Sequence, residues 1–293
     1  MQAVQIVGVH GIGQAGSSRR QLTEDWGKAL QRGIKEFTGR PGQTPTLHMP
    51  HWTPLVIKGT DRLGPEDDPF GESVLMAAEE EEFVADALRD VVRPEDLAFA
   101  EEQTLATLGP PKLWSPRITR LAMAYDRRFA RGGAQLFVRS MREVRLYLTE
   151  PDLATKVRAL VREDFTSATS VVIGHSLGSV IAYDLFRHQD VGSARGAHGP
   201  AVHTLVTCGS PLGIPSVRRL MGIANGERLG LPDPIRWINV YDPDDFITGG
   251  AGLAAAARNL TDVGVKNGIG DPHSAVRYLR TEPVAHAVAG GPR

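Results

Sequence analysis

Cysteine is nearly absent from this sequence, since Cys208 is the single one among 293 residues. A lone cysteine excludes an intrachain disulfide and is typical of a reducing compartment. Net charge is almost absent too, because 33 Lys and Arg stand against 34 Asp and Glu, for a formal charge of −1. Nothing in this balance points to nucleic acid. We therefore expect a cytoplasmic protein without a nucleic-acid partner.

Long hydrophobic runs are also missing. The sequence has no stretch of about 18 consecutive apolar residues, so it predicts no transmembrane helix. Its first residues, MQAVQIVGV, have no basic segment and only a short apolar run, so we expect a strand there and no signal peptide. The apolar share of 41% is ordinary for a soluble chain of this length, which buries its core without a structural metal.

Short apolar runs alternate with helical periodicity over most of the chain, which predicts a mostly parallel central sheet with helices on both faces. We assign residues 1–54 and 151–293 to this α/β core. The expected strands are 2–9, 46–52, 170–174, 202–208 and 235–241. The expected helices are 18–37, 151–165, 177–188 and 272–280.

Residues 55–150 interrupt this alternation and predict an inserted helical cap. Residues 61–102 hold fifteen Asp or Glu and three Arg, whereas residues 112–145 hold nine Lys or Arg and two acids. One interpretation is a pair of solvated helical faces that attract each other. The other is a basic amphipathic surface that contacts anionic lipid at a membrane.

Residues 174–178, GHSLG, match the pattern G-x-S-x-G. Chance predicts roughly 0.15 such matches in a chain of this composition, so the match alone is weak. Its context is stronger, because a predicted buried strand precedes it and a predicted helix follows. Such a strand–turn–helix presents the central serine as a nucleophile at the positive end of the helix dipole. Ser176 is therefore the candidate nucleophile.

Residues 9–13, VHGIG, follow the first predicted strand. With the pentapeptide, this loop resembles lipases and esterases of the α/β-hydrolase superfamily, and is similar to their GPI-inositol-deacylase-like and bacterial lipase-like members. The resemblance covers residues 1–52 and roughly 151–280. It implies an α/β-hydrolase fold with an oxyanion hole made by the backbone N–H groups of Ile12 and Leu177. His10 is then structural.

The same loop also matches the dinucleotide-binding pattern G-x-G-x-x-G, at Gly11, Gly13 and Gly16. That interpretation requires an acidic residue at the end of the next strand to bind a ribose. The candidate strand 46–52 ends without one. The dinucleotide-binding interpretation also leaves the serine motif unexplained, so we expect no cofactor.

A serine nucleophile needs a base and an acid, which follow it in the order acid then histidine in this fold. The strand 235–241 is followed by Asp242, Asp244 and Asp245. The family pattern aligns Asp245 with the catalytic acid, and Asp242 and then Asp244 are the alternatives. Histidines after these acids are His273 and His286, and the resemblance favours His273, in DPHS, as the base.

Two further residues are expected near the site. The segment TCGSPL at 207–212 resembles the T-x-G-S-P loop of lipase-like hydrolases. The resemblance implies that this loop shapes the floor of the active site. Cys208 within it is expected to be a buried apolar residue and not a reactive thiol. His175 is expected to pack beside the nucleophile.

These residues predict a serine hydrolase that cleaves a carboxylic ester, small or lipidic, through an acyl-enzyme. No cluster of Cys and His suggests a metal site. An acyltransferase or thioesterase would use the same triad, and an interaction protein that kept the fold without catalysis is a third hypothesis. The motifs are common to these hypotheses and do not indicate which ester is the substrate.

Overall fold

Six parallel strands form one sheet in the described part of the computed structural model, in the order β2-β1-β3-β4-β5-β6. The structure describes residues 4–14, 16–39, 45–58, 76–102, 114–129, 132–188, 191, 202–268 and 270–290. The strands are β1 (Gln5–Val9), β2 (Thr46–His48), β3 (Thr169–His175), β4 (Thr204–Cys208), β5 (Arg236–Tyr241) and β6 (Leu260–Gly264). The predicted α/β class with a parallel sheet is confirmed.

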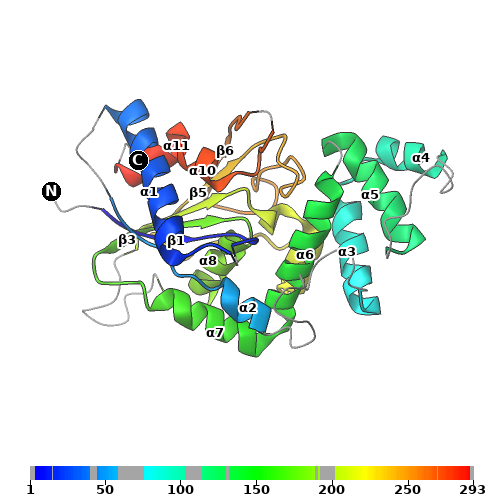
Figure 1. Cartoon of the computed structure of the whole chain (residues 1–293), viewed down its shortest axis with the longest axis horizontal. Helices are drawn as coiled ribbons and strands as arrows, with labels where there is room; N and C mark the ends of the chain where they lie inside the picture. Colours follow the sequence, from blue (N-terminus) through cyan, green and yellow to red (C-terminus); the bar gives the residue numbers. More distant parts are fainter. Residues whose placement is uncertain are drawn as a thin grey trace.

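Helices cover both faces of the sheet (Figure 1). On one face lie α1 (Arg19–Thr38), α10 (Ala275–Leu279) and α11 (Glu282–Val288), which share one hydrophobic core with the strands. On the other lie α2 (Thr53–Lys58), α7 (Pro151–Arg162), α8 (Leu177–Arg187), the 3-10 turn η2 (Pro211–Gly213) and α9 (Pro215–Leu220). Two layers of helix around one sheet are the arrangement that the alternating pattern predicts.

The central strand β3 shows why this pattern specifies a two-sided core. Val171 and Ile173 belong to the core under α1, whereas Val172 between them belongs to the core under α8. Successive side chains of a strand point to opposite faces, so an unbroken apolar run requires cover on both sides. All three are at most 1% exposed.

The helix α1 agrees closely with the predicted helix 18–37, because its ends carry local signals. Ser18 is the N-cap, and its hydroxyl accepts a hydrogen bond from the Gln21 amide at 3.1 Å. Gly39 ends the helix in the left-handed conformation, with φ of 63°. Helix α7 likewise begins with Pro151 in its first turn.

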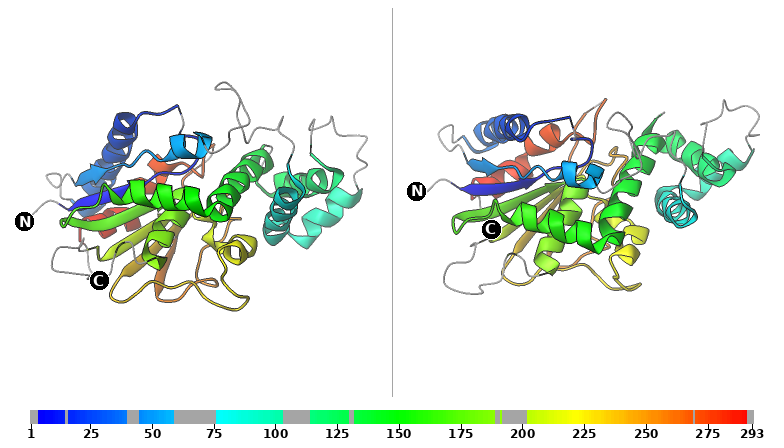
Figure 2. Two further views of the ribbon diagram at one scale, coloured as in Figure 1. Left: turned by 90° about the horizontal axis from the view of Figure 1, so that it is seen from below. Right: turned by 60° about the horizontal axis from the view of Figure 1, so that its bottom comes forward.

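The insertion between α2 and α7 is helical in its described parts, as its periodicity predicts. Its helices are α3 (Ala78–Val91), α4 (Pro94–Glu102), α5 (Pro116–Phe129) and α6 (Gly133–Thr149). Figure 2 shows α3, α4 and α5 projecting beyond one end of the sheet, with α6 between them and the core. We call α3, α4 and α5 the cap helices. Residues 59–75 and 103–113 of the predicted insertion lie outside the described residues.

Ion pairs join the acidic and basic parts of this insertion. They are Glu82–Arg117 (2.5 Å), Asp96–Arg127 (3.2 Å), Glu80–Arg142 (2.8 Å) and Glu79–Arg145 (3.3 Å). The two charged faces therefore attract each other, as the first interpretation holds, but Arg142 and Asp96 are buried and not solvated. Contact of the basic face with a membrane stays a prediction.

Three segments differ from what the sequence predicts. The predicted strand 46–52 ends at His48, and a helix begins at Thr53. The edge strand β6 was not expected. Helix α11, which follows the last expected helix and packs on α1, was not expected either.

A membrane-spanning helix is not found in the described part of the chain, where every helix is too short or too polar to cross a bilayer.

Candidate active site

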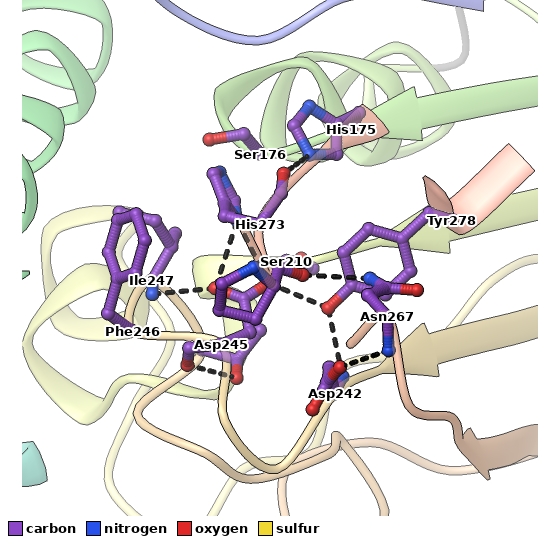
Figure 3. Close-up of polar contacts among 12 residues, drawn as sticks. His175, Ser176, Ser210, Asp242, Asp245, Phe246, Ile247, Asn267, His273 and Tyr278 are labelled. Atoms are coloured by element: carbon purple, nitrogen blue, oxygen red, sulfur yellow. Dashed lines mark hydrogen bonds and ion pairs between the residues drawn. The ribbon is translucent and has the colours of Figure 1, made fainter. Parts of the chain in front are cut away.

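The predicted site residues lie at one edge of the sheet, beyond the carboxyl ends of its strands. The loop with Ile12 follows β1, Ser176 follows β3, and Asp245 follows β5. Parallel strands bring these loops together although they are far apart in the sequence. His273 comes from the loop before α10. Figure 3 shows its ring between Ser176 and the carboxylate of Asp245.

Ser176 occupies a strained turn between β3 and α8. Its φ of 55° and ψ of −130° are unusual for a residue with a side chain. Its amide donates to the carbonyl of Cys208 at 3.0 Å, and its own carbonyl accepts from the Ser179 amide at 2.9 Å. These bonds hold the strained residue in place at the N-terminus of α8.

The two glycines of the pentapeptide are required by close packing. A Cβ on Gly178 would lie 2.0 Å from the carbonyl oxygen of Val9, and one on Gly174 would lie 2.6 Å from the Gly178 oxygen. Both distances are far below van der Waals contact. Helix α8 therefore approaches β1 so closely that no side chain fits.

Asp245 and His273 form a hydrogen-bonded pair. Nδ1 of His273 lies 2.9 Å from each carboxylate oxygen of Asp245. Asp245 is fully buried, and it also accepts from the Ile247 amide (2.8 Å) and the Tyr278 hydroxyl (2.7 Å). The amide and the hydroxyl thus hold the carboxylate toward the imidazole.

The neighbouring acids have different surroundings. Asp242 is buried, and its carboxylate accepts from the amides of Asp244 (2.8 Å) and Asn267 (2.5 Å). It therefore closes the turn, as aspartate commonly does. Asp244 is exposed. Of the three candidate acids, the geometry brings only Asp245 to His273 within the described residues.

The second ring nitrogen of His273 is available for proton transfer. Nε2 is buried and has no hydrogen-bond partner among the described residues. The ring is held by contacts with His175, at 4.6 Å between centroids, and with Phe246, at 5.4 Å. A neutral imidazole that donates from Nδ1 has a free lone pair on Nε2. The other candidate base, His286, lies on α11 and faces Glu282.

His175 supports the loop that carries His273. Its Nε2 lies 2.7 Å from the carbonyl oxygen of His273, so Nε2–H is the donor. Burial lowers the pKa of His175 well below its ordinary value, and the nearby charge of His273 lowers it further. A neutral His175 therefore packs beside the nucleophile, where the sequence predicts it.

The loop after β1 lies directly against the nucleophile. A Cβ on Gly11 would come within 2.7 Å of the Ser176 Cβ. His10, one residue earlier, stacks on Trp52 at 5.0 Å between centroids, and its Nδ1 lies 2.8 Å from the Gly11 carbonyl oxygen. Burial lowers the pKa of His10 to about 4. His10 is thus a neutral packing residue beneath the loop.

The predicted oxyanion donors border this arrangement. Leu177 is the first residue of α8, where an amide has no acceptor within its own helix. Ile12 is part of the loop that covers Ser176 and is partly buried against the core. Both amides thus belong to the backbone segments that flank the nucleophile.

The loop after β4 forms the floor of the site. Gly209 has a φ of 56°, and a Cβ there would lie 2.8 Å from Oδ2 of Asp245 and 3.0 Å from Nδ1 of His273. The hydroxyl of Ser210 shares a hydrogen bond with that of Ser179 at 2.7 Å. Cys208 is buried, and burial raises the pKa of its thiol. The thiol is therefore protonated and is not a nucleophile.

Two residues of the site were missed by reasoning from sequence. The Tyr278 hydroxyl joins the Asp245 carboxylate to the Asp242 amide. Gly209 leaves room for the pair of Asp245 and His273. Their only signals were the tyrosine after His273 and the glycine of the TCGSPL phrase, and neither indicates a contact.

Comparison with known proteins adds no further assignment: no family model, no curated protein and no solved structure matches this chain.

Proposed function

We propose that this chain is a serine hydrolase of the α/β-hydrolase superfamily that cleaves carboxylic esters. The single observation that carries the proposal is the buried pair of Asp245 and His273, joined at 2.9 Å, beside the strained Ser176. A carboxylate, an imidazole and a serine in this order are the components of nucleophilic acyl transfer.

In the acylation step, Oγ of Ser176 attacks the ester carbonyl while Nε2 of His273 takes the hydroxyl proton. Nε2 has no competing partner among the described residues. Asp245 stabilises the imidazolium that forms, and its three fixed donors keep it from reorienting. The protonated His273 then gives its proton to the leaving alcohol, which leaves an acyl-enzyme on Ser176.

Negative charge develops on the carbonyl oxygen as the serine attacks. We assign its stabilisation to the amides of Ile12 and Leu177, of which the second has no intrahelical acceptor. Two such donors in a preorganised site contribute about 3 kcal/mol each to transition-state stabilisation. The N-terminal end of α8 adds a favourable dipole.

Water completes the reaction in the second step. His273 accepts a proton from the water as it attacks the acyl carbonyl, and the proton then returns to Oγ of Ser176 as the acid is released. The VHGIG and GHSLG sequences support an ester as substrate, since they resemble those of lipases and esterases.

The test is hydrolysis of p-nitrophenyl butyrate by the wild-type chain and by two serine variants. Ser176→Ala should lose the activity by about 10⁴-fold or more. Ser170→Ala is the control, because Ser170 lies on β3 at the far end from the site and should keep the activity. Equal activity of Ser176→Ala and the wild type would refute the proposal.

A further inference from the structure

A large cavity lies between the cap and the back of the candidate triad. Its volume is about 1060 Å³, and its walls come from α4, α5 and α6 on one side and from the loops after β5 and β6 on the other. Asp244 and Pro272, next in sequence to Asp245 and His273, line it. The ring of Phe246 separates it from His273, at 5.4 Å between ring centroids.

Basic side chains outnumber acidic ones around this cavity. Its lining includes four cations and two acids, namely Arg93, Arg127, Arg128, Lys266, Asp96 and Asp244. Arg127 and Asp96 form an ion pair at 3.2 Å, so their charges cancel. Arg93 lies 4.0 Å from Glu95. Arg128, Lys266 and the exposed carboxylate of Asp244 are the remaining charges on the wall, so the cavity has a net positive lining.

Arg128 lines this cavity with its guanidinium over the ring of Phe129, at 4.6 Å from the centroid. It is partly buried, and one guanidinium nitrogen donates to the carbonyl of Val91 at 2.7 Å. Burial and then the charge of Arg93 lower its pKa from the ordinary value. Within the described ranges, no carboxylate lies at ion-pair distance from Arg128. A partly buried guanidinium without a counter-charge is costly, and a bound anion would remove that cost.

Lys266 approaches the cavity from the opposite wall, on the loop after β6. It has no ion-pair partner in the part of the chain that the structure describes. The walls between the two cations include apolar surface from Phe129, Leu136 and Phe246. A cavity of this size, with cations on facing walls and apolar surface between them, fits a small organic anion.

We propose that this cavity binds the anionic end of the ester substrate, a terminal carboxylate or phosphate, through Arg128 and Lys266. The inference rests on the proposed function and specifies its substrate class. Arginine binds such groups through two parallel hydrogen bonds, and lysine adds a point charge. The acyl or alcohol chain would then extend past Phe246 toward Ser176.

A pair of matched esters tests the proposal. p-Nitrophenyl hydrogen glutarate carries a terminal carboxylate, and p-nitrophenyl pentanoate has the same chain length without it. The wild-type kcat/KM should favour the glutarate by about tenfold, since charge-assisted hydrogen bonds are the stronger class. Arg128→Gln should remove most of this preference, and Lys266→Gln should reduce it about threefold. Lys28→Gln, on α1, should keep it.

Lys266→Gln changes an exposed residue, so it keeps the test valid if Arg128→Gln fails to fold. A wild type without preference, or a preference that survives in both variants, would overturn the proposal.

A binding measurement separates this proposal from the proposed function. Calorimetric titration with inorganic pyrophosphate needs no hydrolysis, and it can use Ser176→Ala as well as the wild type. Binding that is lost in Lys266→Gln supports an anion site even if neither ester is cleaved. No binding, or equal binding by Lys266→Gln, would refute it. Pyrophosphate binding without any preference between the two esters would show a separate effector and overturn the assignment to substrate.

Discussion

The hydroxyl of Tyr278 lies 2.7 Å from Oδ2 of Asp245 and donates a hydrogen bond to it. The hydroxyl oxygen of Tyr278 in turn accepts a hydrogen bond from the Asp242 amide at 2.9 Å. Burial and the charge of Asp245 raise the pKa of Tyr278, so the hydroxyl stays protonated. One tyrosine thus holds the acid and the turn that presents it.

Tyr278→Phe should therefore lower both stability and activity. The variant leaves the buried Asp242 amide without its acceptor, which costs about 1–3 kcal/mol in the free energy of unfolding. Asp245 loses one of its three donors, and kcat should fall by less than about tenfold. Urea unfolding and ester hydrolysis measure the two effects. Unchanged values of both would contradict this role.

The assignment of the acid predicts different effects for two neighbouring variants. Asp245→Asn should lower kcat by about 10⁴-fold, because an amide cannot stabilise the imidazolium and favours the wrong tautomer. Asp242→Asn should mainly lower stability, because Asp242 accepts two backbone amides of its turn. Hydrolysis of p-nitrophenyl butyrate measures the first effect and urea unfolding the second. Loss of activity in Asp242→Asn alone would refute the assignment.

The space around two glycines predicts opposite effects of alanine substitution on stability. Gly178→Ala should destabilise the fold by about 3 kcal/mol or more, because its Cβ would overlap the Val9 carbonyl. Gly27→Ala should stabilise it by about 0.5–1 kcal/mol, because Gly27 lies within α1 with open space around its Cβ position. Thermal unfolding compares the two. A Gly178→Ala variant as stable as the wild type would show that α8 and β1 are farther apart.

The lowered pKa of the buried His10 predicts that the folded state loses stability in mild acid. Its pKa is 6.5 when unfolded and about 4 when folded, so the unfolded chain binds the proton more tightly. Stability is therefore highest above pH 6.5 and is lost as the pH falls toward 4. Between pH 7 and pH 5 this histidine alone should cost about 2 kcal/mol.

Urea unfolding of His10→Gln at both pH values checks this linkage. The variant should lose about 2 kcal/mol less than the wild type on acidification. Equal pH dependence of His10→Gln and the wild type would contradict a buried neutral His10.

The elements that the sequence predicts well are those with local signals. Ser18 caps α1, Pro151 begins α7, and β3 contains the uninterrupted apolar run VVI. The edge strand β6 has the sequence LTDVG, with a half-exposed pattern that carries little β signal. Helix α11 was missed because its stability comes from packing against α1, which a local pattern does not show.

The residues of the candidate site likewise fall into those that the sequence indicates and those that it does not. Ser176 and His273 were indicated by a motif, the chain order and the family resemblance. The resemblance alone favoured Asp245 among three acids, and the structure brings Asp245 to His273. The contacts of Tyr278 and Gly209 depend on how separate loops meet after folding, so no spacing in the sequence indicates them.

The most direct test of the central claim is covalent labelling with a fluorophosphonate probe, which reacts with an activated serine. We expect the wild type and Ser170→Ala to be labelled in one-to-one ratio and Ser176→Ala to remain unlabelled. Mass spectrometry should place the probe on the peptide with Ser176. A folded wild type that is not labelled, or a Ser176→Ala variant labelled equally well, would contradict the central claim.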